Sequence, residues 1–212
     1  MKNIVPFCIT ILFFAYCTSF RSGSNGWISL FDGRSLEGWK ASENPSTFKV
    51  ENGLLVVHGP RAHLFYNGPV LNHNFKNSEL KVRVMTTPGS NSGIFFHTKF
   101  QEDGWPSKGY EVQVNNSHTD WRRTGSLYAV QDVKEVYVKD NEWYTEHIIV
   151  KDKNVIVKIN DRTVVEYTEP PAIADSLANT EGKKISSGTF ALQGHDPESK
   201  VFYKEVLVKP LQ

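Results

Sequence analysis

The sequence predicts an all-β fold, a two-sheet antiparallel β-sandwich. Apolar and polar residues alternate with a period of two in short segments such as 79–84 and 154–159. Turn signals separate these segments, and no stretch keeps an apolar period of 3.6 residues. About a dozen short strands joined by turns, with almost no helix, are expected to pack as two antiparallel sheets.

Two hairpins are predicted from their turn residues. Segment 154–159 meets Asn160-Asp161, a two-residue turn signal, and continues as strand 163–167. Residues 51–53 (Glu-Asn-Gly) separate strand 47–50 from strand 54–57 in the same way. Further strands are predicted at 93–98, 110–115, 143–151, 188–193 and 201–209, and one short helical turn at 173–177.

The composition is that of a soluble globular protein. The chain has 212 residues, of which 39% are hydrophobic and 22% charged, and 24 basic residues balance 23 acidic ones. A net charge of +1 argues against nucleic acid as a partner. Without an internal repeat or a low-complexity linker, a single domain over 26–212 is expected.

The N-terminus resembles a targeting segment. Lys2 precedes an apolar run over 4–16, which is shorter than the roughly 20 residues of a membrane span. We therefore expect a signal peptide over 1–22 and no membrane span. Cys17 could be lipidated after cleavage, or the cleavage could be a plain one. Cys8 and Cys17 both lie here, so the mature chain would lack thiols, and export without disulfides favours a bacterial periplasm or cell surface.

Three groups of motifs resemble one family. They are 27–39 (WISLFDGRSLEGW), 91–97 (NSGIFFH) with 109–114 (GYEVQV), and 188–195 (GTFALQGH) with 201–206 (VFYKEV). In this order they look like the 3-keto-disaccharide hydrolase family, catalogued as DUF1080, over 27–211. The resemblance implies a concanavalin A-like lectin/glucanase jelly roll and export in Bacteroidota-type bacteria. It also implies cleavage of glycosides that are oxidised to a ketone at sugar carbon 3.

Strand 110–115 is the centre of the predicted site. Because side chains alternate between faces, Glu111, Gln113 and Asn115 should share one face, opposite an apolar set at 110, 112 and 114. Retaining glucanases use two carboxylates about 5–5.5 Å apart. This strand offers only Glu111, and glutamine cannot act as an acid or base. A standard mechanism would thus need a second acid from elsewhere.

A 3-keto sugar has other requirements, because its ketone acidifies the hydrogen on carbon 2. Such a reaction needs a base, donors aimed at the ketone oxygen and an acid for the leaving group. Glu111 is the candidate base or acid/base. Gln113, Asn91 or His97 could polarise the ketone or hold hydroxyls. The candidate catalytic residues are Glu111, His97 and His195, and the candidate substrate-binding residues are Gln113, Asn91, Tyr128, Trp105, Trp121, Gln193 and His63.

No metal or other cofactor is expected, because the histidines lack close ligand spacing, although a structural calcium held by loop oxygens stays open. His58, His73 and His118 are assigned to structural or surface positions. The expected partner is an oligosaccharide or glycoside, and the oligomeric state is left open. Two alternatives remain: a non-catalytic carbohydrate-binding module that uses Trp105 and Trp121, and a plain structural or interaction domain.

Overall fold

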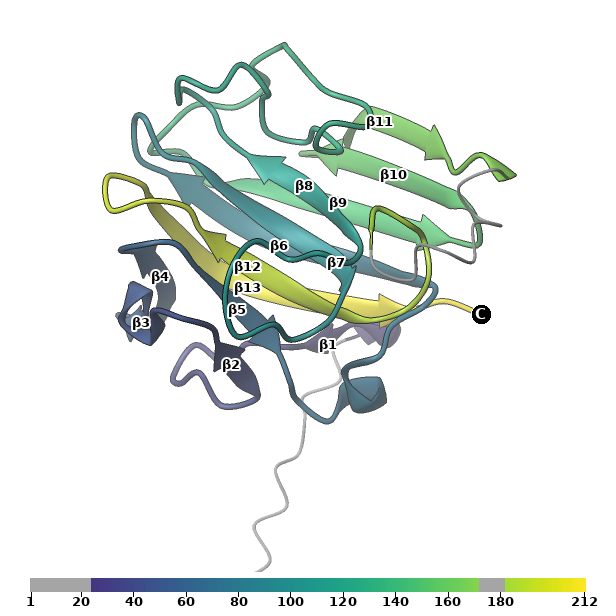
Figure 1. Cartoon of the computed structure of the whole chain (residues 1–212), viewed down its shortest axis with the longest axis horizontal. Coiled ribbons are helices and arrows are strands. Elements are labelled where there is room, and N and C mark those ends of the chain that lie inside the picture. The colour runs from purple at the N-terminus through teal and green to yellow at the C-terminus, as the bar shows by residue number, and fades with distance from the viewer. Residues whose placement is uncertain (1–23, 172–181) are drawn as a thin grey trace, which may run out of the picture.

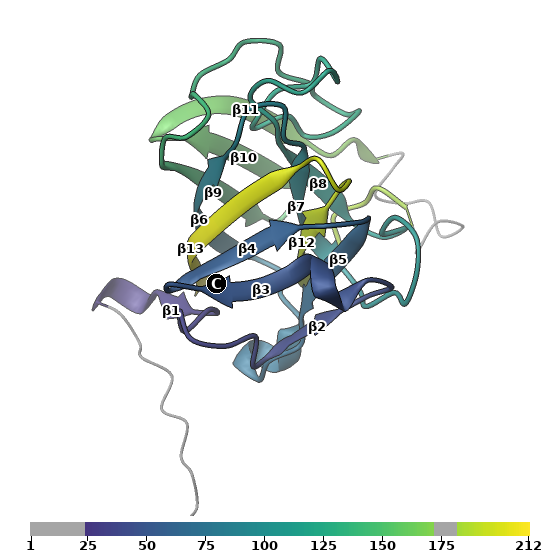
Figure 2. The ribbon, with the colours of Figure 1, turned by 90° about the vertical axis from the view of Figure 1, so that its left-hand side faces the viewer.

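The computed structural model describes residues 24–171 and 182–212. Within them the strands form two antiparallel sheets packed as a β-sandwich (Figures 1 and 2), so the predicted fold class is confirmed. The predicted signal peptide at 1–22, including Cys17, and the predicted helical turn at 173–177 lie outside the described residues. In the described part, no helix has the length and apolar character needed to span a membrane.

The two sheets differ in size. The eight-stranded sheet runs in the order β11 (Arg162–Thr168), β10 (Asn154–Ile159), β9 (Tyr144–Lys151), β6 (Ser78–Thr86), β13 (Lys200–Pro210), β4 (Leu54–His58) and β3 (Phe48–Glu51), with β1 (Ile28–Ser29) paired to β13. The five-stranded sheet runs β2 (Trp39–Ala41), β5 (Ala62–Tyr66), β12 (Thr189–Gly194), β7 (Ser92–Thr98) and β8 (Tyr110–Val114). Short 3-10 turns lie at η1 (Ser24–Gly26), η2 (Pro45–Thr47) and η3 (Val70–His73).

Both predicted hairpins are confirmed. Asn160 and Asp161 join β10 to β11 with φ angles of 47° and 68°, and Asn52 and Gly53 join β3 to β4 with φ angles of 51° and 80°. Positive φ at both central residues is the signature of a type I′ turn, whose twist matches that of the flanking strands. The turn chemistry therefore fixes these two registers locally.

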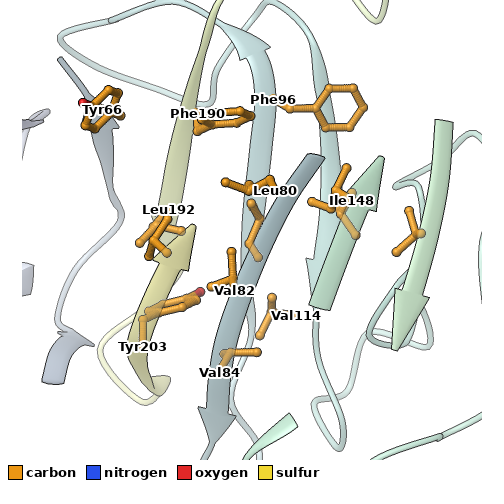
Figure 3. Close-up of a cluster of buried hydrophobic side chains, with 14 of the residues drawn as sticks. Tyr66, Leu80, Val82, Val84, Phe96, Val114, Ile148, Phe190, Leu192 and Tyr203 are labelled. Atoms are coloured by element: carbon orange, nitrogen blue, oxygen red, sulfur yellow. The ribbon is translucent and has the colours of Figure 1, made fainter. Parts of the chain in front are cut away.

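The core lies between the sheets and follows the period-two pattern. In β6, the buried side chains of Leu80, Val82 and Val84 alternate with partly exposed ones. Figure 3 shows these side chains packed with Ile148 and Tyr203 from the eight-stranded sheet and with Tyr66, Phe96, Val114, Phe190 and Leu192 from the five-stranded sheet. Each fully buried side chain of this kind stabilises the fold by roughly 1.5–3 kcal/mol.

Two loops, 99–109 and 115–143, border the outer face of the five-stranded sheet. Phe100 of the first loop packs on Phe65 and Phe95, which point outward from the sheet. The second loop folds back on β8, where the main-chain N–H of Gly125 donates to the carbonyl of Gln113 at 2.9 Å. These loops turn one face of the sheet into the floor of a cavity.

Candidate active site

A cavity of about 360 Å³ lies between these loops and the sheet, a size typical of small-molecule sites. Strands β7, β8 and β12 supply its floor. Its lining comprises Asn91, Phe95, Trp105, Pro106, Ser107, Gly109, Glu111, Gln113, Asp120, Tyr128, Gly182, Lys183, Gln193 and His195. Seven of the ten candidate residues from the sequence are therefore brought together: Glu111, His195, Gln113, Asn91, Tyr128, Trp105 and Gln193.

The Glu111 carboxyl group reaches across one whole strand. It lies on β8, yet its Oε1 accepts a hydrogen bond of 2.8 Å from Nε2 of Gln193 on β12, with β7 between them. Strands two apart are separated by roughly 10 Å. The crossing is feasible because β7 has Gly93 at this point, where an added Cβ would lie 2.2 Å from Glu111 Oε1. Gly93 is thus needed for the position of the carboxyl group.

The surroundings of Glu111 set its protonation. Burial raises the pKa of this carboxyl group, while the Gln193 hydrogen bond and the Lys183 charge lower it; Asp120 raises it again, and the result is a pKa of about 7. A carboxyl group with a pKa near neutral can both take and return a proton at physiological pH. The site therefore holds a group suited to general acid–base chemistry.

An amide pair lies beside Glu111. Gln113 donates from Nε2 to Asn91 Oδ1 at 3.0 Å, and the main-chain N–H of Asn91 donates to Ser199 Oγ at 2.8 Å. Both amide side chains are buried and both line the cavity. The predicted alternation on β8 is confirmed for its apolar set, because Tyr110, Val112 and Val114 lie in the core.

Tyr128 and Lys183 also line the cavity and are linked to Glu111 through the main chain. The main-chain N–H of Tyr128 donates to the Glu111 carbonyl at 3.0 Å, and Lys183 Nζ donates to the Tyr128 carbonyl at 2.6 Å. Partial burial lowers the pKa of Lys183, and the Glu111 and Asp132 charges oppose that shift. Lys183 thus brings an ammonium group to the cavity that contains Glu111.

A cluster of three potential metal-binding side chains borders the cavity. His195 donates from Nδ1 to Asp196 Oδ2 at 2.5 Å, and its ring centroid lies 5.5 Å from that of His118. One donor atom from each of His118, His195 and Asp196 lies within 4.8 Å of the others. His118, assigned from the sequence to a structural or surface position, therefore adjoins a cavity residue.

Only one of the two candidate tryptophans lines the cavity. Trp105 and Trp121 are equally exposed, at 47% and 46%. Trp105 lines the cavity, with its ring centroid 5.5 Å from that of His195. Trp121 lies on a separate surface depression with Arg123 and Lys134. Only Trp105 is placed to contact a ligand in the cavity.

His97 lies away from the cavity because a β-bulge interrupts the alternation of β7. Thr98 pairs with Thr189 but Phe95 pairs with Ala191, so β7 has one extra residue there. His97 has a φ of 55°, donates from Nε2 to the Lys76 carbonyl at 2.8 Å and accepts from the Ser186 N–H at Nδ1. Burial lowers its pKa to about 4. Both ring nitrogens are thus engaged with the main chain.

His63 lies beneath Trp105 and outside the cavity lining. Its ring centroid is 5.5 Å from that of Trp105 and 5.4 Å from that of Phe95, and the side chain is fully buried. Burial lowers its pKa to about 4, and neither ring nitrogen has a hydrogen-bond partner among the described residues. A neutral His63 therefore supports Trp105 from below.

Sequence reasoning missed Asp120, Lys183 and Gly93. Asp120 and Lys183 come from loops, where no periodicity indicates the direction of a side chain. Gly93 enters the sequence prediction only as the first residue of the strand 93–98. A glycine inside a strand pattern is a signal of close approach, and that signal could have indicated a crossing side chain.

Replacing Gly93 with alanine is expected to displace the Glu111 carboxyl group, because the new methyl group would overlap it, and so to lower about 10- to 100-fold any turnover that depends on Glu111. Turnover and melting temperature should be measured for Gly93→Ala alone and in a Glu111→Gln background. In that background the glycine change should cause no further loss. A loss of equal size in both backgrounds would show that Gly93 acts independently of Glu111.

Comparisons with known proteins identify relatives of this chain. A family model described as the 3-keto-alpha-glucoside-1,2-lyase-like domain matches residues 26–209. The chain is similar to a Bacteroides thetaiotaomicron protein named 3-keto-disaccharide hydrolase, with 25% identity over an alignment of 232 positions, gaps included, that covers 89% of this chain and 79% of that protein.

Two solved structures show the same fold. One is a Parabacteroides distasonis ATCC 8503 protein with the provisional name glycosyl hydrolase, which matches with a TM-score of 0.71 at 24% identity, over 88% of this chain and 94% of that one. The other is the carbohydrate-binding module CBM66 from Bacillus subtilis, with a TM-score of 0.55 at 10% identity, over 81% and 95% of the two chains.

Proposed function

This chain belongs to the 3-keto-alpha-glucoside-1,2-lyase-like family, and we propose that it cleaves glycosides whose sugar carries a ketone at carbon 3. The family name and the relative named 3-keto-disaccharide hydrolase support a carbohydrate-active hydrolase. The observation on which the proposal depends is the Glu111 carboxyl group, which Gln193 holds in the cavity and whose pKa is raised to about 7.

Glu111 acts as the base in this proposal. In its ionised form it takes the proton from sugar carbon 2, which the neighbouring ketone has acidified, and the electron pair moves into an enolate. The enolate then re-forms the ketone while a double bond forms between carbons 1 and 2. The bond from carbon 1 to the aglycone oxygen breaks, and that oxygen takes a proton from the protonated Glu111. Addition of water across the new double bond completes a net hydrolysis.

The negative charge of the enolate needs a positive partner. Lys183 lines the same cavity as Glu111, and its pKa is sensitive to the Glu111 charge. Among the described residues that line the cavity, Lys183 supplies an ammonium group. This positive charge can offset the negative charge that develops on the ketone oxygen. Asn91 and Gln113 add amide groups that can hold sugar hydroxyls.

A second candidate function is a carbohydrate-binding module without catalysis. The likeness to CBM66 and the exposed Trp105 at the cavity favour it. We prefer the enzyme because a binding module has no need for a buried carboxyl group with a pKa near neutral. We also propose that the protein is exported, on the basis of its N-terminal sequence over 1–22.

The test offers a 3-keto-glucoside and the matching unoxidised glucoside to the protein and follows aglycone release. Release from the keto substrate alone is expected. Trp105→Ala should raise KM about tenfold, equivalent to about 1.4 kcal/mol of lost binding, while Trp121→Ala, equally exposed but outside the cavity, should leave KM unchanged. Binding of both glucosides without release of aglycone would favour the binding module.

A further inference from the structure

The cluster of His118, His195 and Asp196 has the composition of a metal site. His118 comes from the loop over 115–143, whereas His195 and Asp196 directly follow β12. Three donor atoms, one from each side chain, lie within 4.8 Å of one another, and each side chain is only partly buried. We propose that they bind a divalent transition-metal ion, with Zn²⁺ as the representative, whose open coordination position faces the cavity that His195 lines.

The donor set indicates which metal is preferred. Two imidazoles and one carboxylate, with a further position left open, are the usual protein ligands of a catalytic zinc ion. Imidazole favours Zn²⁺ and its first-row neighbours. Ca²⁺ prefers six to eight oxygen ligands, which this cluster does not offer. The cluster therefore differs from a structural calcium site held by loop oxygens.

The hydrogen bonds of the cluster show which of its atoms act as acceptors and so carry lone pairs. Asp196 Oδ2 accepts from His195 Nδ1, and its Oδ1 is fixed by the main-chain N–H groups of Glu198 at 3.0 Å and Ser199 at 2.8 Å. His118 Nδ1 accepts from the main-chain N–H of Asp120 at 3.0 Å, so that nitrogen offers a lone pair.

A cation can take the place of the proton that His195 shares with Asp196. That proton then moves to Nε2 of the same ring, so the ring stays neutral while Nδ1 becomes a ligand. Zinc ligands lie about 2.0–2.2 Å from the ion. The three donor atoms, which lie within 4.8 Å of one another, therefore need only to move closer together around the ion.

The location gives the ion a use in the proposed reaction, and this step depends on the proposed function. His195 is two residues from Gln193, which holds the Glu111 carboxyl group. A metal beside this pair can polarise the ketone oxygen of a 3-keto sugar as a Lewis acid, while Glu111 takes the proton from carbon 2. Lys183 and the ion would then share the enolate charge.

The experiment measures metal binding directly, so its outcome is independent of turnover. The untagged protein, stripped with a chelator, is titrated with Zn²⁺ and separately with Ca²⁺ by calorimetry. One Zn²⁺ per chain is expected to bind and to raise the melting temperature. His118→Ala and Asp196→Asn should each weaken binding at least tenfold. His58→Ala, an exposed histidine on the other sheet, and Glu111→Gln should bind Zn²⁺ like the wild type.

Three results would overturn the site: no Zn²⁺ binding by the wild type, equal binding by His118→Ala, or a preference for Ca²⁺. Melting curves without metal establish that each variant is folded, and His118→Gln replaces His118→Ala if the smaller side chain destabilises the loop. Zn²⁺ binding by a protein that releases no aglycone from any keto substrate would retain the site and reject the proposed reaction.

Discussion

Glu111→Gln is expected to lower kcat on a 3-keto-glucoside by about 10²- to 10⁴-fold, the usual contribution of a general base. Glutamine keeps the shape of the side chain and can still accept the Gln193 hydrogen bond, but it cannot take a proton. Steady-state turnover with a purified keto substrate measures the effect. Glu102→Gln, which changes an exposed carboxylate in the loop over 99–109, is the matched control and should keep full activity.

The pH profile gives a second measurement for the same residue. The base must be ionised, so kcat/KM should rise with pH and level off above about 7, where burial has placed the pKa of Glu111. Lys183 lowers this pKa and Asp120 raises it, so Lys183→Met should move the rise to higher pH. A Glu111→Gln enzyme that keeps more than a tenth of wild-type kcat would exclude Glu111 as the base.

Glu146→Met is expected to stabilise the protein by about 2 kcal/mol or more at pH 7. Glu146 lies on β9 with its side chain in the core, is 0% exposed, and has no hydrogen-bond partner for either carboxyl oxygen among the described residues. A buried polar group without a partner costs about 1–3 kcal/mol. Methionine has a similar length and fills the same space with apolar atoms, so chemical denaturation should give a higher free energy of unfolding.

Ionisation adds a pH-dependent part to this effect. Burial raises the pKa of Glu146 well above 4.5, so the folded protein keeps the proton that the unfolded chain releases. Below pH 4.5 the carboxyl group is protonated in both the folded and the unfolded chain. Above pH 4.5 the free energy of unfolding declines by about 1.4 kcal/mol per pH unit, until the folded pKa is reached. The free energy of unfolding of Glu146→Gln, relative to that of the wild type, should increase with pH at that rate.

Buried histidines with lowered pKa values change wild-type stability in the opposite direction, so the difference between variant and wild type is the quantity to follow. Glu166→Gln removes an exposed carboxylate from β11 and should show no such slope. If the difference in free energy of unfolding between Glu146→Gln and the wild type stays constant from pH 5 to pH 8, Glu146 is ionised in the folded protein.

Period-two alternation predicted the fold and part of the site because it reports which side chains share a face. On β8 it separated Glu111 and Gln113 from the core set, and the structure confirms that separation. It failed at His97 because one extra residue in β7 interrupts the alternation there. A bulge of this kind depends on the neighbouring strand, so β7 read alone cannot indicate it.

The rest of the cavity depends on contacts between distant parts of the chain. Asp120 and Lys183 belong to loops, and His118 meets His195 across 77 positions of sequence. A short ligand spacing such as His-x-x-x-His indicates only metal sites whose ligands lie on one element. The ligands of this cluster come from distant parts of the chain, so no such spacing is present. In the same way, alternation assigns Glu146 to the core face but cannot tell whether a carboxyl group there finds a partner.

The position of β12 and β13 has a consequence for the order in which the protein folds. Residues 189–210 supply an interior strand to each sheet: β12 lies between β5 and β7, and β13 between β4 and β6. Neither sheet can be continuous until these residues have joined it. Such long-range pairing gives a high contact order and slow folding. The floor that joins Glu111 to Gln193 therefore depends on this long-range pairing, and a chain in which β12 has not yet joined the sheet has the base without the residue that holds it.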